Sequence, residues 1–447
     1  MNHRASPTVL ALLGVAALAC VAASPPPGPA MPVLPDGLGV NIHFTDPKPG
    51  EMKMIADGGF RWVRMDFVWG TTERAKGRYD FAAYDTLMAA LEPHGIRALF
   101  IFDYANRLYD DGLSPHTDEG RQAFARWAAA AAVHFKGRGV LWEMYNEPNV
   151  KFWKPEPKVE DYIALAREVG KALREATPEE VYIGPATSRV DLPFLEACFK
   201  GGLLEYWSAV SVHPYRQAAP ETVADDYACL RRLIDQYAPA GRHIPILSGE
   251  WGYSAVSKNF SEERQGKYLP RQWLTNLLYG VPVSIWYDWH DDGPDPKEYE
   301  HHFGTVLNPY HEGRDPVYDP KLAYRAARAL TIVLAGCRFV KRLPAGGADD
   351  YVLLFADAQG GVRLAAWTSA DQPHAVTVPA SPGQFAVAGH TGEALPNLSA
   401  EASGLAIMLT DAPQYLLPQR PNELLHRAAA PAAAAGSGLS APAGEVK

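Results

Sequence analysis

The feature that most constrains the fold of this 447-residue chain is a regular alternation of short apolar segments with longer amphipathic ones. Beyond Gly37, eight segments have the length and composition of β-strands. They are residues 38–43, 61–67, 97–103, 140–146, 181–184, 207–213, 244–250 and 281–287. The segments between them have apolar residues at helical three- and four-residue spacing, over 81–91, 119–135, 159–173, 223–237 and 263–278. Thr117 is a candidate N-cap for the second of these helices.

This alternation predicts an α/β fold, because successive parallel strands need a crossover, usually a helix, to return the chain. Eight strand–helix units predict a (β/α)8 TIM barrel. An open, doubly wound parallel sheet is the alternative. No glycine-rich phosphate loop follows the first strand, which counts against the open sheet.

The helical spacing ends near residue 335, and short strand-like segments follow at 351–356, 362–367, 374–378, 385–389 and 406–410. They predict a small β-sandwich at residues 336–418, beside a barrel at residues 36–335. The proline-rich residues 24–35 are interpreted as a linker, and the alanine- and proline-rich residues 419–447 as a disordered tail.

The N-terminus is typical of an export signal. His3 and Arg4 precede an apolar segment at residues 9–22, which is too short to span a bilayer, and cleavage is expected after Ala23. A lipoprotein signal ending at Cys20 is the alternative. We therefore expect a secreted or periplasmic protein with no transmembrane span in the mature chain, and a monomer.

The net charge and the cysteines exclude several functions. A formal charge of -9 argues against nucleic-acid binding, which needs a basic surface. Cys198, Cys229 and Cys337 show neither CxxC spacing nor a histidine cluster, so zinc and redox roles are not expected, and a Cys198–Cys229 disulfide is left open. We expect no cofactor and no metal, and interpret residues 288–316 as a loop that shapes a cleft.

Polar and aromatic residues stand where the predicted strands end, and in a parallel barrel these ends meet at one rim. Two glutamates are the most informative of them: Glu147 in Trp-Glu-Met-Tyr-Asn-Glu-Pro-Asn (142–149) and Glu250 in Ser-Gly-Glu-Trp-Gly (248–252). A carboxylate at the end of a buried strand is costly unless a ligand or catalysis uses it. The pair suggests an acid/base and a nucleophile for splitting a glycosidic bond.

These two motifs, with His-Pro-Tyr (213–215) between them, resemble those of clan A glycoside hydrolases over roughly residues 37–335. The nearest likeness is to the family of β-xylosidases, α-L-iduronidase and bacterial exopolysaccharide endoglycosidases (family 39), with family 5 cellulases more distant. The resemblance implies a retaining mechanism on a carbohydrate substrate, with Glu147 as acid/base and Glu250 as nucleophile.

The resemblance also implies roles around the glutamates. Asn146 would contact the sugar 2-hydroxyl, Arg64 would keep Glu250 ionised, and His213 or Tyr215 would orient a carboxylate. Trp286 would form the floor of the cleavage subsite. Further candidates for sugar binding are His43, Asp103, Tyr104, Trp69, Trp153 and Trp251. Glu143 points to the same side as Glu147 and is expected to be a buried partner of Arg64.

Three functions follow from this reading. The leading one is an exported retaining glycosidase that cleaves β-linked polysaccharide or oligosaccharide, with endo-action favoured because aromatic residues stand on several rim loops. An exo-acting enzyme similar to β-xylosidases is the nearest alternative. A non-catalytic carbohydrate-binding barrel is the third, and the presence of both glutamates counts against it.

Overall fold

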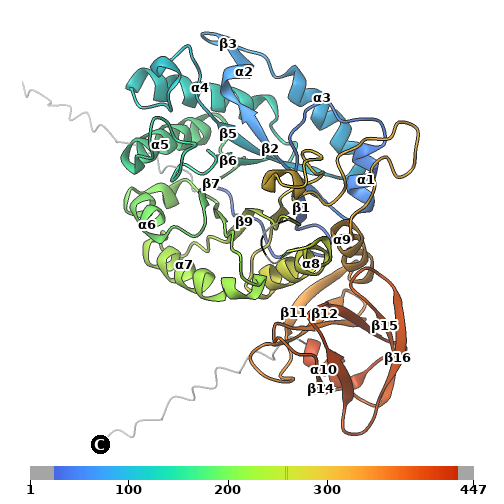
Figure 1. The fold of residues 1–447 in the computed structure, drawn as a ribbon. Coiled ribbons are helices and arrows are strands. Elements are labelled where there is room, and N and C mark those ends of the chain that lie inside the picture. Colours follow the sequence, from blue (N-terminus) through green and yellow to red (C-terminus); the bar gives the residue numbers. More distant parts are fainter. Residues whose placement is uncertain (1–24, 257, 259, 431–447) are drawn as a thin grey trace, which may run out of the picture.

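The computed structural model describes residues 25–430 except 257 and 259, and its largest part is a closed barrel of eight parallel strands (Figure 1). The strands, in their order around the barrel, are β1 (Leu38–Asn41), β2 (Trp62–Val68), β5 (Arg97–Asp103), β6 (Leu141–Met144), β7 (Val181–Ser188), β8 (Ala209–His213), β9 (Ile246–Trp251) and β10 (Ser284–Trp286). β10 pairs with β1 and closes the barrel. All eight predicted strands, and the predicted TIM barrel, are confirmed.

Helices surround the barrel in the places that the apolar spacing predicts. They are α1 (Glu51–Asp57), α2 (Trp69–Thr72), α3 (Ala82–Leu91), α4 (Asp118–His134), α5 (Val159–Ala176), α6 (Leu192–Lys200), α7 (Ala224–Tyr237), α8 (Glu262–Leu278) and α9 (Leu322–Val333). Thr117 caps α4, because its side chain accepts a hydrogen bond from the Gly120 N–H. A two-stranded hairpin, β3 (Glu73–Ala75) and β4 (Arg78–Tyr79), follows α2.

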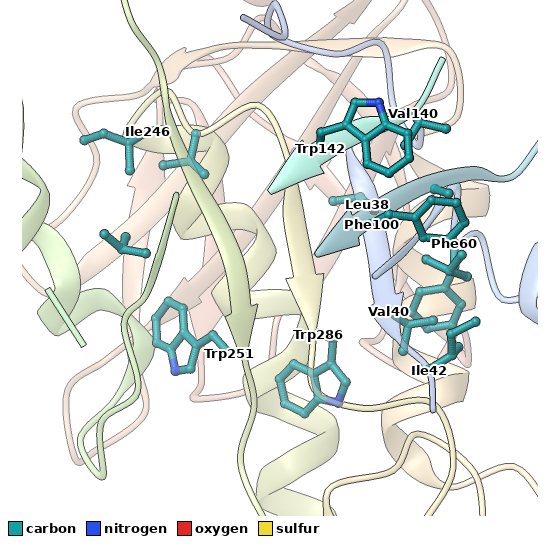
Figure 2. Packing of buried hydrophobic residues seen from close by; sticks show 14 of the residues in the cluster. Leu38, Val40, Ile42, Phe60, Phe100, Val140, Trp142, Ile246, Trp251 and Trp286 are labelled. Carbon is teal, nitrogen blue, oxygen red and sulfur yellow. The ribbon is translucent and has the colours of Figure 1, made fainter. Parts of the chain in front are cut away.

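Side chains alternate between the inside of the barrel and the layer between strands and helices. Leu141 and Ile285 belong to a small cluster of apolar side chains from the barrel strands. Their neighbours Trp142 and Trp286 belong to the large cluster that includes helix side chains. Figure 2 shows Trp142 and Trp286 within this large cluster. The alternation follows the two-residue period of a strand and fixes which residues can face the strand ends.

A β-sandwich follows the barrel, as predicted, and lies against α8 and α9 (Figure 1). Its large sheet has the order β11 (Cys337–Arg342), β12 (Asp350–Asp357), β13 (Val362–Thr368), β18 (Gln414–Pro418), β15 (Gly383–Ala388) and β16 (Ala394–Ala400). Its small sheet pairs β14 (His374–Val378) with β17 (Leu405–Leu409). Three of these strands, β11, β16 and β18, have no counterpart among the strands predicted from the sequence.

The barrel and the sandwich share one apolar core. Tyr351 and Phe355 of β12 point into the same cluster as the barrel side chains, whereas Val352 and Leu354 point into the core between the two small-domain sheets. A buried ion pair also crosses the junction. Arg271 of α8 donates two hydrogen bonds of 2.7 Å to Glu221, which also accepts from the Trp367 indole of β13 at 2.7 Å.

The two segments interpreted as linker and tail are packed in part. Leu34 is buried, its N–H donates to the Cys337 carbonyl, and the Ser208 hydroxyl donates to the Pro26 carbonyl. Residues 25–35 therefore lie against the barrel. At the other end, α10 (Glu423–Ala429) buries Leu425 in the sandwich core. The predicted disorder is therefore wrong for residues 419–430, because the predicted tail includes an apolar helix face.

The remaining expectations about the chain ends lie outside the described residues. Residues 1–24, with the predicted signal and Cys20, and residues 431–447 belong to this part of the sequence. Within the described part, no helix has the length and apolar character to cross a membrane. Cys198, Cys229 and Cys337 are all free thiols, so no Cys198–Cys229 disulfide is formed.

Candidate active site

A pocket of about 520 Å³ opens at the carboxyl ends of the barrel strands, and its volume is typical of a small-molecule site. It is lined by Asn41, His43, Arg64, Asp66, Tyr104, Asn146, Glu147, Lys151, Phe152, Ser188, Arg189, Tyr215, Arg216, Gln217, Glu250, Gly252, Tyr287, Tyr299, Glu300 and Phe303. A larger hollow of about 740 Å³ is lined by residues of α1, α9 and nearby loops, and by none of the barrel strands. The pocket at the strand ends holds both glutamates of the two motifs, as the sequence predicts.

Glu147 and Glu250 approach each other across this pocket. One carboxylate oxygen of each, together with a ring nitrogen of His213, lie within 4.8 Å of one another. The side chains are largely covered, with 12% of Glu147 and 13% of Glu250 exposed. Two carboxylates at this separation can act on the same bond of a bound ligand.

The backbone departs from regular strand geometry at both glutamates, and this departure aims them. Tyr145 and Glu147 have left-handed φ values of 64° and 44°, which cost about 1–3 kcal/mol each. Adjacent residues Asn146 and Glu147 can then both line the pocket, which a regular strand does not allow. In β9 the pairing with β10 shifts between Ser248 and Trp251, and this irregularity directs Glu250 to the pocket.

Arg64 of β2 is a buried cation that links residues at the ends of β6 and β9 through hydrogen bonds. Its guanidinium donates to Glu143 (2.7 Å), to Glu250 (2.6 Å) and to the Asn146 amide oxygen (2.9 Å). Burial opposes the charge, but Glu143 and Glu250 outweigh it and raise the pKa of Arg64. Glu143 also accepts from Ser211 and is fully buried. Glu143 is therefore the structural partner of Arg64, as the sequence analysis expects.

Glu250 receives one donor on each oxygen. Arg64 binds Oε2, and the Tyr215 hydroxyl donates to Oε1 at 2.8 Å. Such charge-assisted hydrogen bonds hold the carboxylate in one orientation. The structure thus brings together Arg64, Tyr215 and Glu250 as the sequence predicts.

Glu147 has a different environment. Its carboxylate oxygen lies 3.0 Å from His213 Nδ1, and burial raises the pKa of Glu147 above its ordinary value. His213 is fully buried, and burial lowers the pKa of His213 to about 4. His213 is therefore neutral near pH 7. A proton on Nδ1 gives it a hydrogen bond to Glu147, since Nε2 has no partner among the described residues.

Asn146 is fixed by two hydrogen bonds. Its amide oxygen accepts from Arg64, and its amide nitrogen donates to the Tyr104 hydroxyl at 2.9 Å. His43 lies on the opposite side of the pocket and is 3.4 Å from Asp288. Burial opposes the charge on His43, but the hydrogen bond and charge of Asp288 raise the pKa of His43 to about 9. His43 is therefore a cation near neutral pH.

Asp103 does not line the pocket. It is fully buried, and burial, followed by the charge of Asp66, raises the pKa of Asp103 well above its ordinary value. Asp66, two residues before the end of β2, lines the pocket instead. The prediction that Asp103 contacts substrate is therefore wrong, because the adjacent strand presents its own carboxylate there.

The predicted tryptophans are also not in the pocket. Trp251 and Trp286 are fully buried, and Figure 2 shows them among the side chains of the large cluster. Trp69 and Trp153 are 1% exposed. The prediction of Trp286 as the subsite floor is wrong because Ile285 takes the position inside the barrel and Trp286 the next one, outside it. The pocket is lined instead by the aromatic rings of Tyr104, Phe152, Tyr215, Tyr287, Tyr299 and Phe303.

Loops after the strands supply pocket residues that were not predicted from the sequence. Lys151 and Phe152 follow Glu147, and Arg189 follows β7. Glu300 and Phe303 belong to the segment 288–316, which does shape the cleft as predicted. Lys151 and Phe152 lie close to the Asn-Glu-Pro motif in the sequence, and this proximity could have identified them as pocket residues.

Two groups of described residues have the composition of metal ligands, namely Glu147, His213 and Glu250, and His43, Asp288 and Asp292. In the first group, His213 Nδ1 is engaged with Glu147, and in the second His43 is paired with Asp288. The first group is an arrangement of two carboxylates with a neutral orienting imidazole, which suits acid–base chemistry.

A family model described as Cellulase (glycosyl hydrolase family 5) matches residues 38–293, more than half of the chain. The chain belongs to this cellulase family. The family 5 relationship, which the motifs suggested as the more distant one, thus extends over nearly the whole barrel. This cellulase-family chain is an O-glycosyl hydrolase.

Solved structures similar to this cellulase-family protein include family 39 enzymes. A family 39 glycoside hydrolase from the gut symbiont Bacteroides cellulosilyticus WH2 has a TM-score of 0.74 and 25% identity, covering 86% of this chain and 81% of that one. A family 39 β-xylosidase from Caulobacter crescentus has a TM-score of 0.63 and 17% identity, covering 89% and 98%. A conserved exported protein from Bacteroides fragilis has a TM-score of 0.65 and 14% identity, covering 87% of this chain and 98% of that one. No curated protein matched the sequence.

Proposed function

We propose that this glycoside hydrolase cleaves β-linked polysaccharide or oligosaccharide with retention of anomeric configuration. The observation that carries the proposal is the approach of the Glu147 and Glu250 carboxylate oxygens to within 4.8 Å. Retaining enzymes hold their carboxyl groups about 5–5.5 Å apart, whereas inverting enzymes need about 6.5–9.5 Å to admit a water molecule.

In the first step, Glu250 attacks the anomeric carbon and Glu147 protonates the leaving oxygen. The two environments suit these roles. Arg64 and Tyr215 each donate to one oxygen of Glu250 and hold its carboxylate in position for attack. Burial raises the pKa of Glu147, so the proton that the leaving group requires is retained nearer neutral pH.

In the second step, Glu147 takes a proton from the water that attacks the glycosyl–enzyme ester, and Glu250 is released. His213 Nδ1–H supports the carboxylate form of Glu147 in this step. Because His213 is neutral, it orients Glu147 without adding a positive charge that would lower the pKa of the acid. Asn146, held by Arg64 and Tyr104, is placed to bind the sugar 2-hydroxyl.

Substitution of each glutamate tests these roles. Glu250→Gln should lower kcat by several orders of magnitude with an unchanged melting temperature, and Glu300→Gln serves as a pocket carboxylate control with much smaller loss. Glu147→Ala should be rescued by azide on an aryl glycoside with a good leaving group, giving a β-glycosyl azide. Near-normal activity of Glu250→Gln, or an inverted first product seen by NMR, would refute the proposal.

We favour endo-action, because Phe152 and Tyr299 extend the aromatic lining of the pocket onto two loops. The exo-acting alternative has the support of the similar Caulobacter crescentus structure, which is described as a β-xylosidase. Product sizing over time separates the two. Intermediate oligosaccharides at early times support endo-action, and monosaccharide from the start supports exo-action.

We also propose that the protein is exported and acts as a monomer outside the cytoplasm. The apolar residues 9–22 and the cleavage site after Ala23 support export. Cell fractionation of the full chain and of Cys20→Ala is the test. A soluble, processed protein in both cases supports a simple signal peptide, and loss of membrane association in Cys20→Ala alone supports the lipoprotein alternative.

A further inference from the structure

Charges of opposite sign occupy opposite sides of the pocket. Lys151 and Arg189 lie on the side of β6 and β7. Asp66 of β2 lies on the other side, near the Asp288–His43 pair, whereas Glu300 of the loop after β10 lies close enough to Lys151 for their charges to interact. A ligand that spans the pocket therefore meets a cationic end and an acidic end.

The cationic end is the one beside Glu147. Lys151 is four residues after Glu147 in the same loop, and its charge acts on the Glu147 carboxyl. Arg189 directly follows β7, whose Ala186 carbonyl accepts the Glu147 N–H at 3.0 Å. Both cations thus belong to the backbone segments that position the proposed acid.

Neither cation forms an ion pair within the described part of the chain, although the charge of Lys151 acts on the carboxyl groups of Glu147 and Glu300. Among the residues that the structure describes, Lys151 Nζ contacts only the Phe152 ring, at 5.8 Å from its centre, and the Arg189 guanidinium makes no ion pair. Arg216, the third cation of this side, differs because it is paired with Asp226 at 2.8 Å. Two unpaired cations beside the reacting bond are available to a ligand.

Phe152 adds an apolar surface beside Lys151. Its ring is stacked on Tyr104, with centroids 5.9 Å apart and planes 18° from parallel. Both rings line the pocket. An aromatic face flanked by cations suits a pyranose ring that carries a negative group.

We propose that the subsite on the leaving-group side of the cleaved bond binds an anionic sugar, so that the substrate is an acidic β-linked polysaccharide. This inference rests on the proposed function, in which Glu147 protonates the leaving oxygen and the leaving sugar consequently lies beside Glu147. A uronate carboxylate and a sulfate ester share the required chemistry. Asp66 disfavours an anion on the other side of the pocket.

The test compares three matched β-linked oligosaccharides whose leaving sugar carries a carboxylate, a sulfate or neither, with an aryl β-glycoside as a fourth substrate. We expect kcat/KM for an acidic substrate to exceed that for the neutral one by about tenfold at low salt, from two partly exposed ion pairs. The preference should shrink at high ionic strength. The acidic substrate that is preferred identifies the natural anion.

In the Lys151→Met/Arg189→Met double variant, the ratio of kcat/KM for the acidic substrate to kcat/KM for the neutral substrate should fall to about one. Lys154→Met, an exposed lysine of the same loop that does not line the pocket, is the matched control and should keep the preference. Equal activity of the wild type on acidic and neutral substrates, or a preference that survives in the double variant, would overturn the inference. Activity on the aryl glycoside and its loss in Glu250→Gln report on the proposed function separately.

Discussion

Burial of neutral His213 should make the stability of the protein depend on pH. The folded chain holds the pKa of His213 at about 4, whereas the ordinary value is 6.5. Between these values the unfolded chain binds a proton at this residue and the folded chain does not, so acid favours unfolding. At about 1.36 kcal/mol per pKa unit, the free energy of unfolding should fall by about 3 kcal/mol as the pH drops from 6.5 to 4.

His213→Asn isolates this contribution. The asparagine amide can occupy the position of Nδ1 and donate to Glu147, but it does not titrate. Other groups near the site titrate in both proteins, including Asp288, whose pKa burial raises to about 6, and these cancel in the comparison. Urea unfolding of both proteins between pH 7 and pH 4 gives the two dependences.

Over this pH range we expect the free energy of unfolding to fall by about 3 kcal/mol more in the wild type than in the variant. Identical losses would show that His213 is protonated in the folded protein, or becomes exposed before it titrates. Either result would remove the neutral imidazole from the proposed mechanism, because a cationic His213 would lower the pKa of Glu147.

Two further substitutions test the framework of the fold. Glu221→Gln leaves Arg271 buried without its carboxylate at the junction of barrel and sandwich, and should lower the free energy of unfolding, measured in urea, by about 3–5 kcal/mol. The control is Glu263→Gln, which breaks an exposed ion pair with Lys267 of the same helix and should lower this free energy by less than about 1 kcal/mol. Equal losses in the two variants would contradict a buried junction. Gly249→Ala places a Cβ 2.3 Å from the Ser211 hydroxyl and 2.8 Å from a Glu143 carboxylate oxygen. This variant should lower the free energy of unfolding by about 1–3 kcal/mol and should also lower kcat. A fully active variant of equal stability would show that the space beside Gly249 is larger than described.

The barrel could be predicted from the sequence because each of its elements carries its own periodicity. Parallel strands are buried on both faces and are therefore continuous apolar segments, and α5, with six buried apolar or small residues at helical spacing, is equally clear. Irregular segments were less predictable. The sequence prediction ended the fifth strand before Pro185, which has no N–H for the ladder, yet β7 continues to Ser188.

The candidate site was predictable to the extent that it depends on strand ends. Glu147, Glu250, Arg64, His213 and Tyr215 stand there, and the structure brings them together. Apart from Tyr104 and Tyr215, the aromatic lining was not predicted, because one residue of register moves a side chain from the pocket to the helix layer. Trp286 is outside the barrel for this reason, and the next residue, Tyr287, lines the pocket.

Arg64 has a consequence for the use of this protein in synthesis. Because the guanidinium binds Glu143 as well as Glu250, removal of the Glu250 carboxylate leaves the buried cation with one anionic partner. The scaffold should then tolerate Glu250→Gly, which opens space for a small leaving group such as fluoride beneath the sugar. Glu147, supported by His213, would remain as the base that activates an acceptor hydroxyl. The same charge network that serves cleavage therefore makes the barrel a starting point for an enzyme that joins sugars and cannot hydrolyse the product.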